Sequence, residues 1–186
     1  MATTIYVDPR DGLDTNDGQL ATPVKTIIKA LRLGFPTMTY TEGPSEFSFT
    51  YDTTGVYSVD VVIRIVGGTC VLDKVVSINL LEDLSGHSQG HFGLVIQGAK
   101  NAAVVFVGVE AMPYLFSFST GGGYGGNRWS VVTFNNVCFV NDIPSRQMAL
   151  CSVSNTDGAS TTIENVSVRG FVSLGTFQTT NGLRNS

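Results

Sequence analysis

The stretch Thr133-Phe134-Asn135-Asn136-Val137-Cys138-Phe139 decides the fold, because its pattern returns as Thr162-Ile163-Glu164-Asn165-Val166-Ser167-Val168. In each copy, apolar and more polar residues alternate up to an asparagine, and apolar residues follow it almost directly. Such alternation predicts a strand with one buried face. Asparagine tolerates the left-handed backbone region, so each copy predicts a strand, a sharp bend and a second strand.

Aligning these copies with earlier segments of the chain places equivalent residues in columns. The buried column is Ile65, Ile96, Phe134 and Ile163, and the bend column two places later is Gly67, Gly98, Asn136 and Asn165. The outward columns are Arg64, Val95, Thr133 and Thr162, and then Val66, Gln97, Asn135 and Glu164. A strand, a bend, a strand and a loop that repeat at about 30 residues are typical of stacked coils. An antiparallel β-sandwich whose strands happen to align is the alternative.

Most of the other apolar runs are short, β-branched and bounded by Gly, Asn or Asp, which is typical of strands. The predicted strands are Val61–Val66, Val75–Leu80, Phe92–Ile96, Val104–Val109, Ser130–Phe134, Val137–Val140 and Thr161–Val168. The segment from Thr37 to Ser58 has little clear period, and we interpret it as a long loop or an edge hairpin.

One helix is predicted before these strands. Thr22 can cap it, Pro23 suits its first position, and Gly34 followed by Pro36 ends it. Its apolar face consists of Val24, Ile27, Ile28 and Leu31. Such a face needs a surface to cover, and the end of a stack of strands provides one.

The composition excludes several classes of protein. With 42% hydrophobic residues and only 14% charged ones, the chain is not intrinsically disordered. The net charge of −4 and the scattered basic residues argue against binding to nucleic acid or an anionic membrane, and we expect no membrane insertion and no signal peptide. The cysteines Cys70, Cys138 and Cys151 are widely spaced, so we expect reduced thiols in a protein made in a cytoplasm.

The first 31 residues resemble the opening of right-handed parallel β-helix proteins of the pectin-lyase-like superfamily. The resemblance rests on Ile5-Tyr6-Val7-Asp8-Pro9, Asp14-Thr15-Asn16-Asp17-Gly18, Thr22-Pro23-Val24-Lys25-Thr26-Ile27 and Ala30-Leu31. It implies an all-β fold, a right-handed parallel β-helix of few coils with an N-terminal amphipathic capping helix. The cap is expected over residues 1–36 and the short β-helix with inserted loops over 37–186, within one domain.

The resemblance gives several residues a structural role in the cap: Asp8, Asp14, Asn16, Asp17, Gly18, Pro23, Ile27 and Leu31. The far end has no second amphipathic helix, so we expect it to be capped weakly, by another subunit, or by further sequence. The acidic loop suits turn formation by Asp and Asn side chains, with structural calcium at Asp8, Asp14 and Asp17 as the alternative.

The candidate chemistry is sparse, and we assign no catalytic residue, metal or cofactor. Two polar loops, around His87 and His91 and at 121–126, fit a metal or nucleotide site poorly. Loop acids such as Asp142 and Asp157 are better explained as solvated. The best ligand-binding candidates are the aromatic residues Tyr124 and Trp129, which flank the glycine loop.

Together these features favour a non-catalytic structural or recognition protein of a virus particle, similar to a phage tailspike, a tail fibre or a capsid decoration protein. The resemblance implies a homotrimer, with other virion proteins and a cell-surface polysaccharide as partners. The alternative is a polysaccharide lyase or glycoside hydrolase, or its N-terminal fragment, because enzymes of this superfamily act on polysaccharides.

Overall fold

A computed structural model gives the fold of the chain. It describes residues 2–51, 57–80, 90–100, 104–108, 113–120, 128–141, 149–154, 159–170 and 173–178. Strands dominate these residues and helix is rare, so the protein is all-β. The ligand-binding candidate Tyr124 and the loop residues His87, Asp142 and Asp157 lie outside the described residues.

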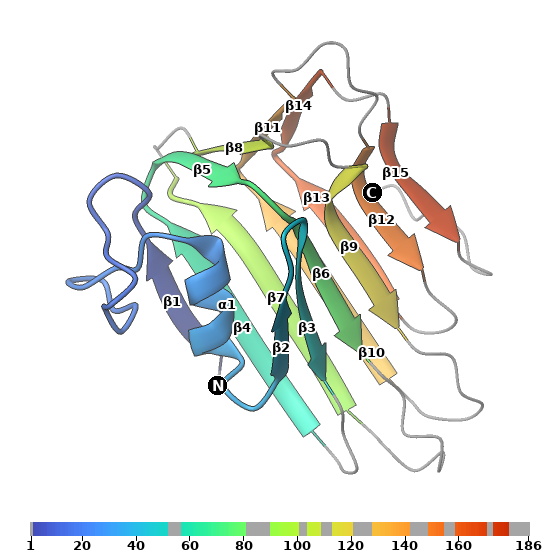
Figure 1. Cartoon of the computed structure of the whole chain (residues 1–186), viewed down its shortest axis with the longest axis horizontal. Helices are drawn as coiled ribbons and strands as arrows, with labels where there is room; N and C mark the ends of the chain where they lie inside the picture. The colour runs from blue at the N-terminus through green and yellow to red at the C-terminus, as the bar shows by residue number, and fades with distance from the viewer. Residues whose placement is uncertain are drawn as a thin grey trace.

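The strands form three sheets (Figure 1). The five-stranded sheet contains β1 (Thr3–Val7), β4 (Tyr57–Ile65), β7 (Gly90–Gly98), β10 (Arg128–Asn135) and β13 (Ala159–Glu164), in that order. The four-stranded sheet contains β5 (Gly68–Leu72), β8 (Val104–Gly108), β11 (Cys138–Val140) and β14 (Ser167–Arg169). The six-stranded sheet contains β2 (Thr39–Glu42), β3 (Glu46–Tyr51), β6 (Val75–Leu80), β9 (Tyr114–Thr120), β12 (Ala149–Ser154) and β15 (Ser173–Gln178).

From β4 onwards, the chain visits the five-stranded, the four-stranded and the six-stranded sheet in turn, and we define one such passage as a circuit. Each strand pairs in parallel with the strand three places later, as β4 does with β7 and β7 with β10. The one antiparallel pair of named strands in the described part of the chain is the hairpin of β2 and β3. The antiparallel sandwich is therefore wrong, and an edge hairpin is the correct interpretation of the segment after Thr37.

The predicted register is wrong by two residues at its first step. Ile63, and not Ile65, lies beside Ile96, while Ile65 pairs with Gly98. The next two steps are confirmed, because Ile96 pairs with Phe134 and Phe134 with Ile163. Both isoleucines of β4 are buried and apolar, so apolar alternation alone does not distinguish them. As a result, Arg64 and not Val66 shares a column with Gln97.

The bends between the five-stranded and four-stranded sheets use the left-handed region. Asn136 and Asn165 have φ angles of 53° and 52°, and Gly67 has a φ of 151°. Asn136 Nδ2 donates to the carbonyls of Gly98 (3.3 Å) and Ala99 (2.8 Å) of the preceding circuit. Gly98 is itself the last residue of strand β7, so its assignment to the bend column is wrong. The bend at Asn165 divides the predicted strand Thr161–Val168 into β13 and β14.

The helix α1 (Ile27–Gly34) begins later than predicted. Thr26 is its N-cap, and Thr22, Pro23 and Val24 precede it. Val24 is extended instead because it forms a parallel bridge with Val7, in which the Asp8 N–H donates to the Val24 carbonyl at 2.8 Å. The predicted end is correct, since Gly34 is the last helical residue and the Phe35 N–H donates to the Leu31 carbonyl.

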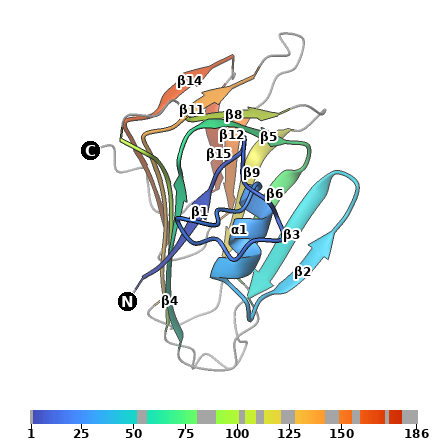
Figure 2. The same ribbon diagram turned by 90° about the vertical axis from the view of Figure 1, so that its left-hand side faces the viewer.

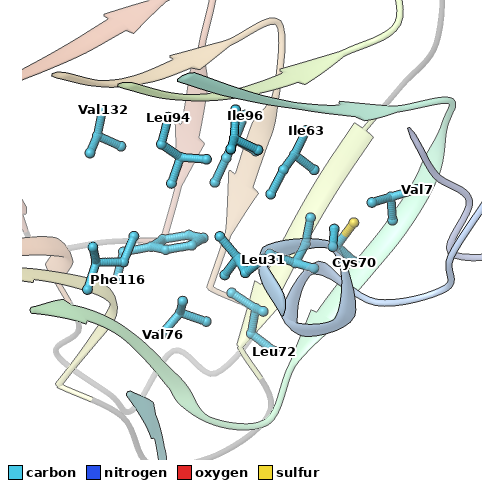
Figure 3. Close-up of a cluster of buried hydrophobic side chains, with 14 of the residues drawn as sticks. Val7, Leu31, Ile63, Cys70, Leu72, Val76, Leu94, Ile96, Phe116 and Val132 are labelled. Atoms are coloured by element: carbon cyan, nitrogen blue, oxygen red, sulfur yellow. The ribbon is translucent and has the colours of Figure 1, made fainter. Parts of the chain in front are cut away.

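The core lies between the sheets, and α1 covers its N-terminal end. Figure 2 shows the helix between the five-stranded sheet and the β2–β3 hairpin. Ile27, Ala30 and Leu31 of the helix are buried, and Leu31 lies near the inward side chains of several strands (Figure 3). Cys70 also belongs to this core as a free thiol, and burial raises its pKa to about 12.

Three phenylalanines from three different sheets meet further along the stack. The ring centroids of Phe116 and Phe134 are 5.1 Å apart, and those of Phe134 and Phe139 are 5.3 Å apart with nearly perpendicular planes. All three side chains are fully buried. This aromatic cluster therefore joins β9, the last strand of one circuit, to β10 and β11 of the next circuit.

Candidate functional site

The N-terminal loop is held by carboxylates that accept hydrogen bonds from the backbone. Asp8 Oδ1 accepts from the N–H groups of Arg10 (3.0 Å) and Asp11 (3.2 Å). Asp14 accepts from the Lys25 and Thr26 N–H groups, both at 2.9 Å, and from Thr26 Oγ1 at 2.8 Å. Through Asp14, the loop fixes the residues that enter α1.

The other cap residues take part in the same loop. Asp17 accepts from the Gln19 N–H (3.3 Å) and the Thr22 hydroxyl, which together lower the pKa of its carboxyl, the hydroxyl contributing most. Asn16 Nδ2 donates to the Pro23 carbonyl at 2.9 Å. Gly18 has a φ of 78°, and its carbonyl accepts from the Tyr6 N–H at 2.8 Å.

These contacts favour the turn-forming role of the acidic loop. Asp8, Asp14 and Asp17 each bind a different part of the backbone, so their oxygens do not converge. Among the described residues, no group of three or more His, Cys, Asp or Glu side chains could hold a metal ion. The acidic loop therefore has a structural role in the cap.

Replacing Asp14 by alanine is expected to destabilise the protein by about 2 kcal/mol, because three hydrogen bonds to a charged acceptor are lost at a helix start. Thermal melting followed by circular dichroism measures the effect. Asp11→Ala is the matched control, since no hydrogen bond to the Asp11 carboxylate occurs within the described part of the chain. Equal melting temperatures for the two variants would contradict the assigned role of Asp14.

An open hollow of about 450 Å³ lies beside α1, where the helix meets β2 and the turn between β5 and β6. Its apolar lining includes Ile28, Val71 and Leu72. Its charged lining consists of Asp14, Lys29, Arg32, Glu42, Asp73 and Lys74. The volume is within the range of small-molecule sites. The lining contains equal numbers of positive and negative side chains, so it has no net charge.

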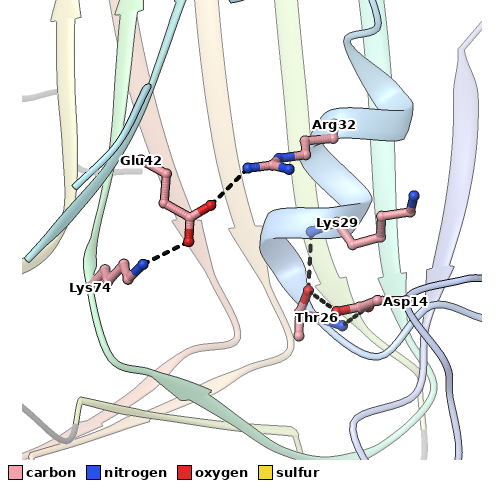
Figure 4. A network of polar contacts seen from close by, with 6 residues as sticks. All are labelled: Asp14, Thr26, Lys29, Arg32, Glu42 and Lys74. Atoms are coloured by element: carbon pink, nitrogen blue, oxygen red, sulfur yellow. Dashed lines mark hydrogen bonds and ion pairs between the residues drawn. The ribbon is translucent and has the colours of Figure 1, made fainter. Parts of the chain in front are cut away.

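The centre of the hollow is a network of three charged residues from three elements (Figure 4). Glu42 of β2 accepts from Arg32 of α1 at 2.9 Å and from Lys74 of the β5–β6 turn at 2.6 Å. The Arg32 guanidinium also lies 5.5 Å from the ring centroid of Tyr40 and 5.2 Å from that of Phe47. The network therefore fastens the helix and the hairpin to the first circuit.

The Glu42 network predicts a weak dependence of stability on pH. The hydrogen bond and charge of Lys74, and to a lesser extent Arg32, lower the pKa of the Glu42 carboxyl. A carboxyl whose pKa is lower in the folded chain stabilises that chain above its unfolded pKa, and this stabilisation disappears as the pH falls through the folded pKa. Melting temperatures measured from pH 7 to pH 3 are therefore expected to fall less in Glu42→Gln than in the native chain. An identical decline in both proteins would contradict this assignment.

A second polar arrangement crosses the outer face of the five-stranded sheet, and we define it as the polar ladder: Tyr6, Arg64, Gln97, Asn135 and Glu164. These residues are adjacent in register from β1 to β13. With the Gln97 amide oriented so that its oxygen faces Arg64, that oxygen accepts from the guanidinium Nε (3.1 Å) and Nη2 (3.2 Å). Asn135 Nδ2 donates to Glu164 Oε2 at 3.1 Å. Two of the four neighbouring pairs, Arg64–Gln97 and Asn135–Glu164, are thus joined by hydrogen bonds between their side chains.

The predicted ligand-binding residues Tyr124 and Trp129 lie largely outside what the structure describes. Trp129 lies on β10 in register with His91 of β7, and its side chain is outside what the structure describes. Tyr124 lies outside the described residues altogether. Sequence reasoning missed the Arg32–Glu42–Lys74 network because its members meet only after the hairpin folds against the helix. It assigned three ladder positions correctly and missed the alignment of Arg64 through the register error.

Comparison with known protein families, with curated proteins and with solved structures found no match. Within the part of the chain that the structure describes, no helix has the length and apolar character needed to cross a membrane.

Proposed function

We propose that the three sheets form a right-handed parallel β-helix and that the chain is a non-catalytic structural and recognition protein of a virus particle. Two features support this proposal: the parallel circuits and the N-terminal residues that resemble the cap of the pectin-lyase-like superfamily. A tailspike, a tail fibre and a capsid decoration protein all fit such a scaffold. Trimer assembly, contacts with other virion proteins and binding to a cell-surface polysaccharide belong to the same proposal.

The polar ladder is the observation that carries the recognition function. Its strands are about 4.8 Å apart, so a rod-like ligand lying across them meets a new polar side chain at each strand. Arg64, Gln97 and Asn135 supply planar donors, and Gln97, Asn135 and Glu164 supply acceptors. A glycan chain suits this surface because it is extended and presents hydroxyl groups that donate and accept along its length.

Two pairs of ladder side chains are preorganised by hydrogen bonds in the absence of a ligand. The Arg64–Gln97 and Asn135–Glu164 hydrogen bonds reduce the freedom that these side chains lose on binding. Tyr6 is half-buried at the end of the ladder, and its ring offers a face for a sugar. The ladder spans five adjacent strands, which favours recognition of a repeating polymer through several weak contacts.

Titration of the purified chain with a panel of neutral and acidic oligosaccharides tests this function. Arg64→Ala with Asn135→Ala is expected to weaken binding of a recognised glycan by about tenfold or more, through loss of two hydrogen-bonding groups. Arg32→Ala is the control, because it removes the same type of side chain from the hollow beside α1. An affinity that is the same in the ladder variant and in the native chain would overturn the ladder as a glycan site. The absence of binding to any member of the panel would do so as well.

Two further measurements test the rest of the proposal. Chromatography of the oligosaccharides after incubation is expected to show intact chains, whereas cleavage products would support the lyase or hydrolase alternative. Antibodies against the chain are expected to label purified virus particles. Labelling of infected-cell extracts without labelling of particles would contradict a place in the virion.

A further inference from the structure

The two ends of the stack of circuits differ in how their strand edges are protected. At the N-terminal end, the Tyr6 N–H of β1 donates to the Gly18 carbonyl at 2.8 Å, and the Val24 N–H donates to the Tyr6 carbonyl at 3.0 Å. The edge of β3 is paired with β2, and α1 covers the core. The outer edges of β5 and of β2 pair with no further strand in the described structure. This end is thus covered over the core and along β1, while β5 and β2 keep open edges.

The C-terminal end carries no such cover in the described structure. β13, β14 and β15 are the last strands of their three sheets, and they lie at the same end of the stack (Figure 1). Ile163 of β13 belongs to the interior column, yet 36% of it is exposed, whereas Ile63, Ile96 and Phe134 in the same column are fully buried. The end face formed by β13, β14 and β15 therefore exposes an apolar side chain, Ile163, that belongs to the interior column.

The charges on these strands suit contact with an identical surface. The three strands contain two charged residues, Glu164 and Arg169, and no lysine or proline, the residues that commonly protect an edge. The Arg169 guanidinium has no partner among the described residues, while the Glu164 carboxylate accepts from Asn135 Nδ2 at 3.1 Å. Around a two-fold axis, a residue of one sign can contact a residue of the opposite sign on the partner, and each such pair then occurs twice.

We propose that two copies of this chain associate through their C-terminal end faces, each formed by β13, β14 and β15. Ile163 is buried against the other copy, and Glu164 of each chain faces Arg169 of the other. Because the contact joins the same face of both chains around a two-fold axis, it occupies both C-terminal end faces and produces a closed pair rather than a fibre. This inference rests on the stacked circuits of the proposed function, and it shares one residue, Glu164, with the polar ladder.

Light scattering after size-exclusion chromatography tests the proposal on the full chain. The native chain is expected to have twice the mass of one copy, or six times that mass where the proposed trimers also form, and Ile163→Lys is expected to halve it. The matched control is Val71→Lys on β5, at the opposite end of the four-stranded sheet, because Val71 is also apolar and 58% exposed. Circular dichroism verifies that both variants are folded.

Reversal of the charges supplies a more specific readout. Arg169→Glu alone is expected to weaken association by about tenfold or more, because it places like charges together across the contact. The double variant Glu164→Arg with Arg169→Glu is expected to restore the association. A native mass that Ile163→Lys leaves unchanged, a monomeric native chain, or a double variant no better than Arg169→Glu would each overturn the proposal. Glycan binding by the Ile163→Lys and Arg169→Glu variants, which keep all five ladder residues, shows separately whether the polar ladder binds a glycan.

Discussion

Replacing Phe134 by alanine is expected to lower the free energy of unfolding by about 3–5 kcal/mol, which is the usual cost of removing a large buried aromatic side chain. Phe134 is fully buried and contacts Phe116 of the six-stranded sheet and Phe139 of the four-stranded sheet. The cavity that remains would lie where three sheets meet, so none of them can close it alone. For a chain of this size, the loss corresponds to a fall in melting temperature of about 10 °C.

Thr133→Ala is the control for this prediction, because Thr133 is adjacent on β10 and belongs to a column on the outer face. It is expected to cost less than about 1 kcal/mol, since it removes only β-propensity and part of an exposed surface. Urea denaturation of the two variants measures the difference directly. Similar losses for both would show that Phe134 does not occupy the centre of a three-sheet core.

Replacing Gly12 by alanine is expected to destabilise the protein by about 3 kcal/mol, as an overpacked site does when its neighbours cannot move. An added Cβ would lie 2.6 Å from the Asp8 carbonyl oxygen and 2.7 Å from the Val24 carbonyl carbon. Both are backbone atoms, and the Val24 carbonyl accepts the hydrogen bond from Asp8 that holds the bridge to β1. Relief of the contact therefore requires the N-terminal loop to separate from the sheet.

Gly43→Ala is the matched control for Gly12. Its added Cβ would lie 3.6 Å from the Glu46 carbonyl oxygen, which is an ordinary contact. Melting temperatures of the two variants are expected to differ by several degrees, with Gly43→Ala close to the native chain. A Gly12→Ala protein as stable as Gly43→Ala would mean that the loop is not packed against β1 as described.

Much of the repeated part was predictable from the sequence, because alternation and the asparagine bends are local signals. Asn136 and Asn165 mark the passage from one sheet to the next, and both have the left-handed φ that their residue type permits. The step from β4 to β7 was not predictable in the same way. Ile63 and Ile65 are both buried and apolar, so the apolar pattern of β4 does not decide which of them lies beside Ile96.

The first residue of α1 was also not predictable from local sequence signals. Pro23 and Val24 satisfy every local rule for a first helical turn, but Val24 bridges to Val7 and Asp14 fixes Thr26 as the N-cap instead. Both contacts span many residues and involve backbone groups. The candidate surfaces were not predictable for the same reason. The Glu42 network and the polar ladder consist of residues that only the tertiary fold makes adjacent.

The central claim is that successive circuits stack in parallel with Ile63, Ile96 and Phe134 side by side. Nuclear Overhauser contacts between the side chains of these three residues, in a protein with selectively labelled isoleucine and phenylalanine, test it most directly. The account predicts strong contacts from Ile96 to Ile63 and to Phe134. Contacts from Ile96 to Ile65 in place of Ile63, or backbone contacts typical of antiparallel strands between β4 and β7, would contradict it.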